Sequence, residues 1–202
     1  MADIRQAVQS DLDAFYNISL KTGHLGRDAT DLYLDPKMMG HIYSAPYLLF
    51  EPKLAYVIEE RDQVVGFCVG AVDTLKFSAL LEETWWPGLR KAYPKPRMSL
   101  RSTWSADERR SHMIHTPESA PKSVVQTYPA HMHMNLLPHV QGRGFGREMF
   151  KHWVQQASRF DVDAIHIGVN AGNVGALRFW ESNGFRRLPV QEGRTIWLGL
   201  KT

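Results

Sequence analysis

The sequence predicts an α/β fold in which helices flank a central sheet of about seven strands. Seven short runs rich in β-branched and aromatic residues alternate along the chain with segments that have helical periodicity. The chain has 202 residues, of which 44% are hydrophobic and 22% charged. This length and balance predict one domain, residues 1–202, with a sizeable core, and argue against disorder.

The N-terminal third begins with a strand at residues 4–8. Apolar residues spaced for one helix face follow over residues 11–21, with Ser10 as a plausible N-cap. A second, shorter helix is expected at 36–44. The β-rich runs 54–59 and 64–72 then predict a hairpin around Arg61-Asp62-Gln63.

The second strand of this hairpin reads VVGFCVGAV and is almost entirely apolar. Such a run predicts a central strand that is buried on both faces. Its Cys68 is the only cysteine of the chain. We therefore expect an unreactive core thiol, and neither a disulfide framework nor a multi-cysteine zinc site.

The composition changes between residues 75 and 127, where a helix predicted at 77–86 is followed by a stretch with several prolines. Strand character returns at 131–137. The expected elements after it are a helix at 144–159, a strand at 164–169, a helix at 174–182 that ends at Asn183-Gly184, and a strand pair at 185–190 and 195–200.

Charge and hydropathy exclude several classes of protein. The formal net charge of +3 is too small for a dedicated nucleic-acid-binding protein. No apolar run approaches the roughly 20 residues of a membrane span, and the N-terminus has no apolar signal-peptide region. The cytoplasm is the expected location.

The most informative segment is Gln141-Gly142-Arg143-Gly144-Phe145-Gly146-Arg147, where a strand leads into a glycine-rich turn that opens a helix. Free backbone N–H groups at a helix N-terminus bind anions, and glycines let the backbone approach them closely. With Arg143 and Arg147, the turn suits a pyrophosphate. Its G-x-G-x-G spacing matches neither the dinucleotide-binding fingerprint nor the P-loop.

This segment resembles motif A (Q/R-x-x-G-x-G/A) of the GNAT N-acetyltransferase superfamily. Residues 170–185, NAGNVGALRFWESNGF, resemble its motif B, N-x-x-A-x-x-F/L-Y-x-x-x-G-F. The resemblance implies a twisted, mixed but mostly antiparallel sheet, with a helical and loop insertion (75–127) between the third and fourth strands. It also implies transfer of acetyl from acetyl-CoA to an amine acceptor: a protein lysine, an amino sugar or a small amine.

The resemblance also implies a cofactor site. The backbone of Leu136 and Leu137 would pair with the pantetheine arm. Asn173 would hydrogen-bond the cofactor, and Ala176 and Phe179 would pack along it. The pyrophosphate would bind the turn formed by Gln141, Gly142, Arg143, Gly144, Phe145, Gly146 and Arg147.

A narrower resemblance covers most of the chain with looser motifs. The segments 15–18 (FYNI), 66–73 (GFCVGAVD) and 85–87 (WWP) are similar to the acetyltransferase-like C-terminal domain of the animal O-GlcNAc hydrolases and to its stand-alone bacterial relatives. We expect no hydrolase catalytic domain in this chain, so hydrolase activity is not implied.

The catalytic groups are less clear, because the motif-B tyrosine that serves many GNAT enzymes as the acid is Trp180 here, and indole is no proton donor for a thiolate. Candidates are His133, which shares one strand face with His131 and Asn135, together with Asp73 and Tyr128. Each has a structural alternative: an interior histidine, a helix cap and a packing tyrosine. The histidine spacing matches no standard zinc pattern, and no metal is expected.

Two functions therefore compete: an N-acetyltransferase, and a catalytically silent module that binds acetyl-CoA or a protein partner. The 75–127 insertion carries nine basic and five acidic residues, so its net charge is +4. It either directs acceptor choice toward an acidic or phosphate-bearing partner or serves as a cover that completes the core. Its basic residues include Arg90, Lys91, Lys95, Arg97, Arg101, Arg109 and Arg110.

Overall fold

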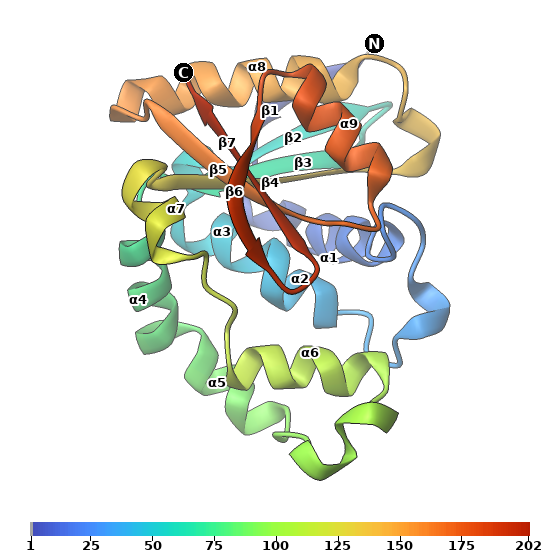
Figure 1. The fold of residues 1–202 in the computed structure, drawn as a ribbon. Coiled ribbons are helices and arrows are strands. Elements are labelled where there is room, and N and C mark those ends of the chain that lie inside the picture. Colours follow the sequence, from blue (N-terminus) through green and yellow to red (C-terminus); the bar gives the residue numbers. More distant parts are fainter. Residues whose placement is uncertain (1) are drawn as a thin grey trace.

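A seven-stranded twisted sheet forms the centre of the protein in the computed structural model, which describes residues 2–202 (Figure 1). The strand order is β1-β2-β3-β4-β5-β7-β6, and only β4 and β5 pair in parallel. The predicted mixed, mostly antiparallel sheet is confirmed. The strands are β1 (Ala2–Gln6), β2 (Tyr56–Glu60), β3 (Gln63–Ala71), β4 (Ala130–Leu136), β5 (Ala164–Asn170), β6 (Arg186–Glu192) and β7 (Thr195–Lys201).

Helices cover both faces of the sheet (Figure 1). On one face lie α8 (Phe145–Ala157) and α9 (Val174–Ser182). The other face carries α1 (Leu12–Lys21), α2 (Met38–Tyr43) and α3 (Ala45–Phe50), of which α3 was not predicted. Short 3₁₀ turns occupy Gln9–Asp11, Thr30–Leu32, Pro52–Leu54, Met98–Thr103, Pro138–Val140 and Ser158–Phe160.

The predicted hairpin forms between β2 and β3, but its turn has two residues rather than three. Arg61 and Asp62 both have positive φ, 55° and 60°. This is the geometry of a two-residue turn whose twist matches that of the flanking strands. As predicted, β3 is central and buried, and burial raises the pKa of the Cys68 thiol.

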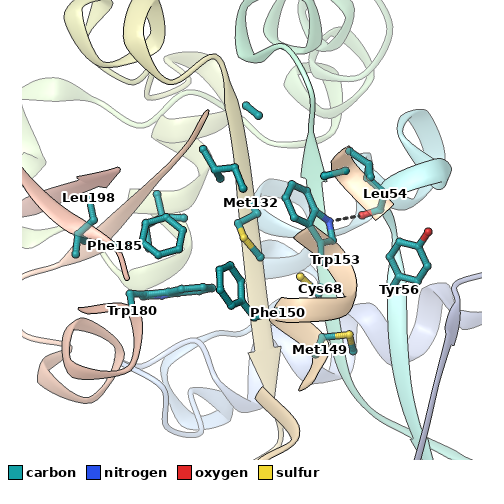
Figure 2. Packing of buried hydrophobic residues seen from close by; sticks show 14 of the residues in the cluster. Leu54, Tyr56, Cys68, Met132, Met149, Phe150, Trp153, Trp180, Phe185 and Leu198 are labelled. Carbon is teal, nitrogen blue, oxygen red and sulfur yellow. Dashed lines mark hydrogen bonds between the residues drawn. The ribbon is translucent and has the colours of Figure 1, made fainter. Parts of the chain in front are cut away.

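The first core lies between the sheet and α8, with Trp153 at its centre (Figure 2). Its indole is fully buried and donates to the carbonyl of Leu54 at 3.0 Å. The ring fills the space above Gly70, where an added Cβ would lie 2.4 Å from the indole. The glycine in β3 thus allows a tryptophan to pack directly on the backbone of the sheet.

The prediction of Ser10 as the N-cap of the first helix is wrong. Ser10 lies inside a 3₁₀ turn, and α1 begins at Leu12. The carboxylate that organises this turn belongs to Asp11, which accepts from the Val8 N–H at 2.8 Å. Arg5 fixes that carboxylate with two hydrogen bonds of 2.8 and 2.9 Å.

Residues 75–127 join β3 to β4 and extend the face that carries α1 to α3 (Figure 1). Phe77, Leu81, Trp86 and Ile114 from this segment are buried in the second core. The segment therefore contributes directly to packing. Its helices are α4 (Thr74–Thr84), α5 (Trp86–Ala92), α6 (Ala106–His115) and α7 (Lys122–Thr127).

Candidate active site

Strands β4 and β5 diverge, and the divergence opens an edge in the middle of the sheet. Their parallel pairing is confined to Ala130 with Ile165 and His131 with His166. Beyond that point β4 continues to pair with β3, and β5 with β7. The second edge of β4 is therefore left without a strand partner from residue 132 to residue 136.

The register of β3 and β4 decides which backbone groups face this open edge. The Leu137 N–H donates to the Val65 carbonyl at 2.9 Å, so these two residues form a hydrogen-bonded pair. Hydrogen-bonded and non-bonded pairs alternate along antiparallel strands. The backbone N–H and C=O groups of Met134 and Leu136 consequently point away from β3, toward the open edge.

The predicted backbone role therefore fits the N–H of Leu136, whose carbonyl already accepts from Gln141 Nε2 at 2.8 Å, and it does not fit Leu137. Both backbone groups of Leu137 are already used, because its carbonyl accepts from the Val140 N–H at 3.0 Å. Met134 takes its place as the second residue with exposed backbone groups. The alternation of pair types along β4 could not be read from the sequence without the register.

The glycine-rich turn presents five consecutive backbone N–H groups, residues 142–146, that have no hydrogen-bond acceptor within the described chain. Gly142 and Gly144 have φ values of 74° and 90°, a region that side chains disfavour. Gly144 also precedes the first turn of α8. Successive free N–H groups at a helix N-terminus form a concavity of the kind that binds anions, and the pyrophosphate role of this turn stays a prediction.

A cavity of about 1000 Å³ connects the turn, the open edge of β4 and the start of α9. Nine of the twelve predicted cofactor residues line it: Leu136, Gln141, Gly142, Gly144, Gly146, Arg147, Asn173, Ala176 and Phe179. Leu137, Arg143 and Phe145 lie outside this lining. Arg143 instead pairs with Glu60 at 2.7 Å and stacks over the Phe145 ring.

Asn173 and Gly146 show how sequence shapes this cavity. The Asn173 carboxamide oxygen caps α9 by accepting from the Ala176 N–H at 3.1 Å, which leaves its NH₂ group available. An added Cβ at Gly146 would lie 3.1 Å from the Phe179 ring. A side chain here would therefore press on the Phe179 ring and require it to shift by a few tenths of an ångström.

The opposite wall, the loop after α1, was missed by the sequence reasoning. Thr22, His24, Leu25, Gly26 and Arg27 line the cavity from this side. The glycines at 23 and 26 predicted the end of the helix, but no local pattern indicated that the loop would face a turn more than 100 residues later. Arg27 adds a second cation, besides Arg147, to the lining.

None of the three predicted catalytic residues is in the cavity lining, and two of them have structural roles. Asp73 caps α4 by accepting from the Lys76 N–H at 3.0 Å, and that contact holds the pKa of its carboxyl below the ordinary value. The Tyr128 ring packs against Gly199, where an added Cβ would lie 2.6 Å from it. The structural alternatives considered for both residues match these contacts.

His133 lies two residues from Asn135, which lines the cavity and shares its strand face. Its ring packs between Tyr43 and Tyr47, at centroid distances of 5.9 and 5.3 Å. Burial lowers its pKa to about 4, so the imidazole is neutral at pH 7. Neither ring nitrogen has a hydrogen-bond partner in residues 2–202, and neither is fully buried.

His131, by contrast, is locked in a hydrogen-bonded chain. The Thr74 hydroxyl donates to the Pro129 carbonyl at 2.7 Å and therefore accepts from His131 Nδ1. Nε2 is then the acceptor for the Tyr47 hydroxyl at 2.7 Å. This chain fixes a neutral tautomer, consistent with the strongly lowered pKa of His131.

Trp180, at the motif-B position where tyrosine is usual, belongs mainly to the core. It packs edge-to-face against Phe150 and Phe185 at centroid distances of 5.7 and 5.2 Å (Figure 2). A third such contact, at 4.9 Å, is with Phe179. One edge reaches the cavity lining. Its contacts are those of a packing residue.

Comparison with known proteins agrees with this architecture. A sequence model described as the Acetyltransferase (GNAT) family matches residues 24–185. The crystal structure of SsHAT is 34% identical, with a TM-score of 0.91, and the match covers 99% of this chain and 98% of that one. The narrower resemblance to the O-GlcNAc hydrolases stays a prediction.

More distant structures share the fold. The yncA protein of Salmonella typhimurium, a putative acetyltransferase solved with its cofactor acetyl-CoA, is 16% identical, with a TM-score of 0.55, and the match covers 99% of this chain and 93% of that one. The PaiA N-acetyltransferase of Thermoplasma acidophilum, solved with coenzyme A, is 12% identical, with a TM-score of 0.61, and the match covers 100% of this chain and 99% of that one. Within residues 2–202, no helix has the length and apolar character needed to cross a membrane.

Proposed function

Because the chain belongs to the acetyltransferase (GNAT) family, we propose that it is an N-acetyltransferase that moves acetyl from acetyl-CoA to an amine. The observation that carries this proposal is the run of free N–H groups at residues 142–146 beside the open edge of β4. The anionic and the amide-bearing parts of acetyl-CoA need these two features side by side. The cavity between them, about 1000 Å³, has the volume for a large ligand.

In this proposal the pyrophosphate binds the turn, with Arg147 and Arg27 adding positive charge. The pantetheine amides pair with the backbone of Met134 and Leu136, as an added strand would. The NH₂ group of Asn173 is available to the cofactor as a donor. Phe179 and Ala176 supply apolar contacts along the same wall.

Acetyl transfer requires a neutral amine, a polarised thioester carbonyl and a way to remove the proton from the attacking nitrogen. Of the predicted candidates, His133 has the surroundings for the last task. Its nitrogens are unbonded, and its pKa of about 4 keeps it neutral as a proton acceptor. Such a weak base accepts a proton only after attack on the carbonyl has made the nitrogen acidic.

The second candidate function is a catalytically silent acetyl-CoA-binding module. The packing of Trp180 favours it, because the residue at the usual acid position is an indole held by three phenylalanines. Under this alternative the cavity binds acetyl-CoA and no transfer follows.

Two measurements separate these functions. Titration calorimetry with acetyl-CoA tests the site itself, and absence of binding at high micromolar concentration would remove both the enzyme and the cofactor-binding module. Release of free coenzyme A thiol is then measured over a panel of protein lysines, amino sugars and small amines. Thiol release above the hydrolysis background with any amine supports the transferase, whereas binding with no release across the panel supports the silent module.

A further inference from the structure

Arg110, on α6, is a partly buried cation whose guanidinium contacts no carboxylate of the described chain. Its Nε donates to the Tyr33 hydroxyl at 3.0 Å, and its Nη1 donates to the Tyr43 hydroxyl at 3.1 Å. Nη1 also contacts Met113 Sδ. Glu118, an exposed residue after α6, acts on it only at longer range and forms no ion pair within 4 Å.

A count of donors and acceptors shows what this cluster lacks. Both tyrosine oxygens accept hydrogen bonds from Arg110, so their own O–H groups are free to donate. The Tyr43 hydroxyl is directed to Met113 Sδ at 3.7 Å, and the Tyr33 hydroxyl proton has no acceptor among residues 2–202. Arg110 Nη2 likewise has no acceptor and is not fully buried. The cluster therefore offers donors and a positive charge.

Burial of an unpaired cation is costly, so such a group is retained where an anion completes it. An Arg fork with unused N–H groups matches the geometry of carboxylate and phosphate oxygens. The neighbouring Arg109 differs, because it is exposed and makes no side-chain contact of this kind in the described structure. The two adjacent arginines on α6 thus have different surroundings.

The position of the cluster connects it with the proposed reaction centre. The Arg110 guanidinium lies 5.5 Å from the centroid of the Tyr43 ring, and that ring lies 5.9 Å from His133. His133 in turn is two residues along β4 from Asn135, in the cavity lining. The Tyr43 ring therefore contacts both Arg110 and His133, and these three residues lie beyond the lining of the cavity that Asn135 borders.

We propose that Arg110, with Tyr33 and Tyr43, forms the acceptor subsite and selects a small amine that also carries a carboxylate or phosphate group. This inference rests on the proposed transferase function and names the substrate class of the same site. Arg110 is then a specificity-determining residue: it holds the anionic end of the acceptor while the amine faces the thioester.

Matched acceptor pairs test the proposal in the intact protein. Thiol release is measured with γ-aminobutyrate against its amide, and with glucosamine 6-phosphate against glucosamine. In at least one of the two pairs, the anionic member is expected to have a kcat/KM about 10- to 100-fold higher than its neutral counterpart, as fits a charge-assisted hydrogen bond. The pair that responds identifies carboxylate or phosphate as the preferred group.

Substitution of Arg110 by glutamine should remove that preference by raising the KM for the anionic acceptor. The Kd for acetyl-CoA should stay within about threefold of the wild-type value. Arg109→Gln is the matched control, since it removes the same charge from the same helix and should retain the preference. If R110Q fails to fold, Tyr33→Phe, which deletes one free donor and keeps the ring, should reduce the preference severalfold.

Three results distinguish failure of the proposed transferase function from failure of the proposed acceptor subsite. Failure to bind acetyl-CoA overturns the proposed function. Thiol release with neutral and anionic members at equal efficiency leaves that function standing and overturns the subsite. Loss of the anionic preference in R109Q as well as R110Q also overturns it, because the effect would then come from net charge rather than from this guanidinium.

Discussion

Gly144→Ala is the sharpest test of the anion site, because the structure separates its backbone effect from side-chain crowding. Gly144 has φ of 90°, and an added Cβ would meet no heavy atom within 4 Å. A residue with a side chain in left-handed backbone costs about 1–2 kcal/mol. Lower entropy of the unfolded chain offsets about 0.4–1 kcal/mol of this. We therefore expect the free energy of unfolding to fall by about 1 kcal/mol.

The same strain acts on acetyl-CoA affinity. A turn that relaxes away from φ of 90° no longer aims the N–H groups of residues 142–146 at one point, and binding must restore that geometry. A cost of about 1.4 kcal/mol corresponds to a tenfold weaker Kd. We expect a Kd about tenfold higher by calorimetry for Gly144→Ala, and no measurable binding for Gly144→Leu, whose larger side chain enters the cavity lining.

Gly88→Ala is the matched control. Gly88 lies in α5, its Cβ position is also open, and its φ is not positive. This change should leave Kd unaltered and raise stability by about 0.5–1 kcal/mol, as for a helix glycine. Gly144→Ala with reduced stability and unchanged Kd would show that the pyrophosphate does not bind this turn. No change in either quantity would refute the backbone argument itself.

Three further predictions follow from other contacts. Gly66→Ala places a Cβ 2.3 Å from Leu136 Cδ2, so it should cost about 1–3 kcal/mol of stability by chemical denaturation and weaken acetyl-CoA binding. His133→Asn should lower kcat by about 10²- to 10⁴-fold with little change in the Kd for acetyl-CoA; equal losses in His152→Asn would count against a specific role. Asp11→Asn should cost about 1.5–3 kcal/mol at pH 7. Arg5 lowers the pKa of Asp11 in the folded protein. The contact therefore stabilises the wild type fully above the unfolded pKa of about 4, and this stabilisation is lost as pH falls through the lower folded pKa. Below that pH the wild type and Asp11→Asn should have equal free energies of unfolding.

Local patterns were sufficient for most of the fold. The alternation of apolar runs gave all seven strands, and the Asn183-Gly184 stop of α9 is realised with Gly184 at φ of 95°. The predictions fail where a residue distant in the sequence determines the local structure. Ser10 has the composition of a cap, but Arg5 fixes Asp11 instead, through a contact that also involves Glu59 on another strand.

The candidate site likewise has parts that local sequence predicts and parts that only the packing of distant segments determines. Its turn is local, so Gly142, Gly144 and Gly146 could be identified from spacing and from the resemblance. The wall formed by Thr22 to Arg27 could not, because its position depends on how α1 packs across the sheet. Arg110 was one of many basic residues in the insertion, and only the arrangement of Tyr33 and Tyr43 around it distinguishes it from Arg109.

Strand β4 explains how one short segment can serve both the cofactor and the acceptor. At residues 132, 134 and 136 the side chains pack into the core beneath α8, and the backbone faces the open edge. At 131, 133 and 135 the backbone bonds to β3, and the polar side chains face α1 to α3. Since both alternations have a period of two, they stay in step along the strand. Even positions thus fix the strand through their side chains and direct their backbone groups to the edge where we propose that acetyl-CoA binds. Odd positions fix the strand through their amides, and among their side chains only that of His133 has no hydrogen-bond partner in residues 2–202. A change at His133 should therefore affect chemistry more than folding, and a change at Met132 the reverse.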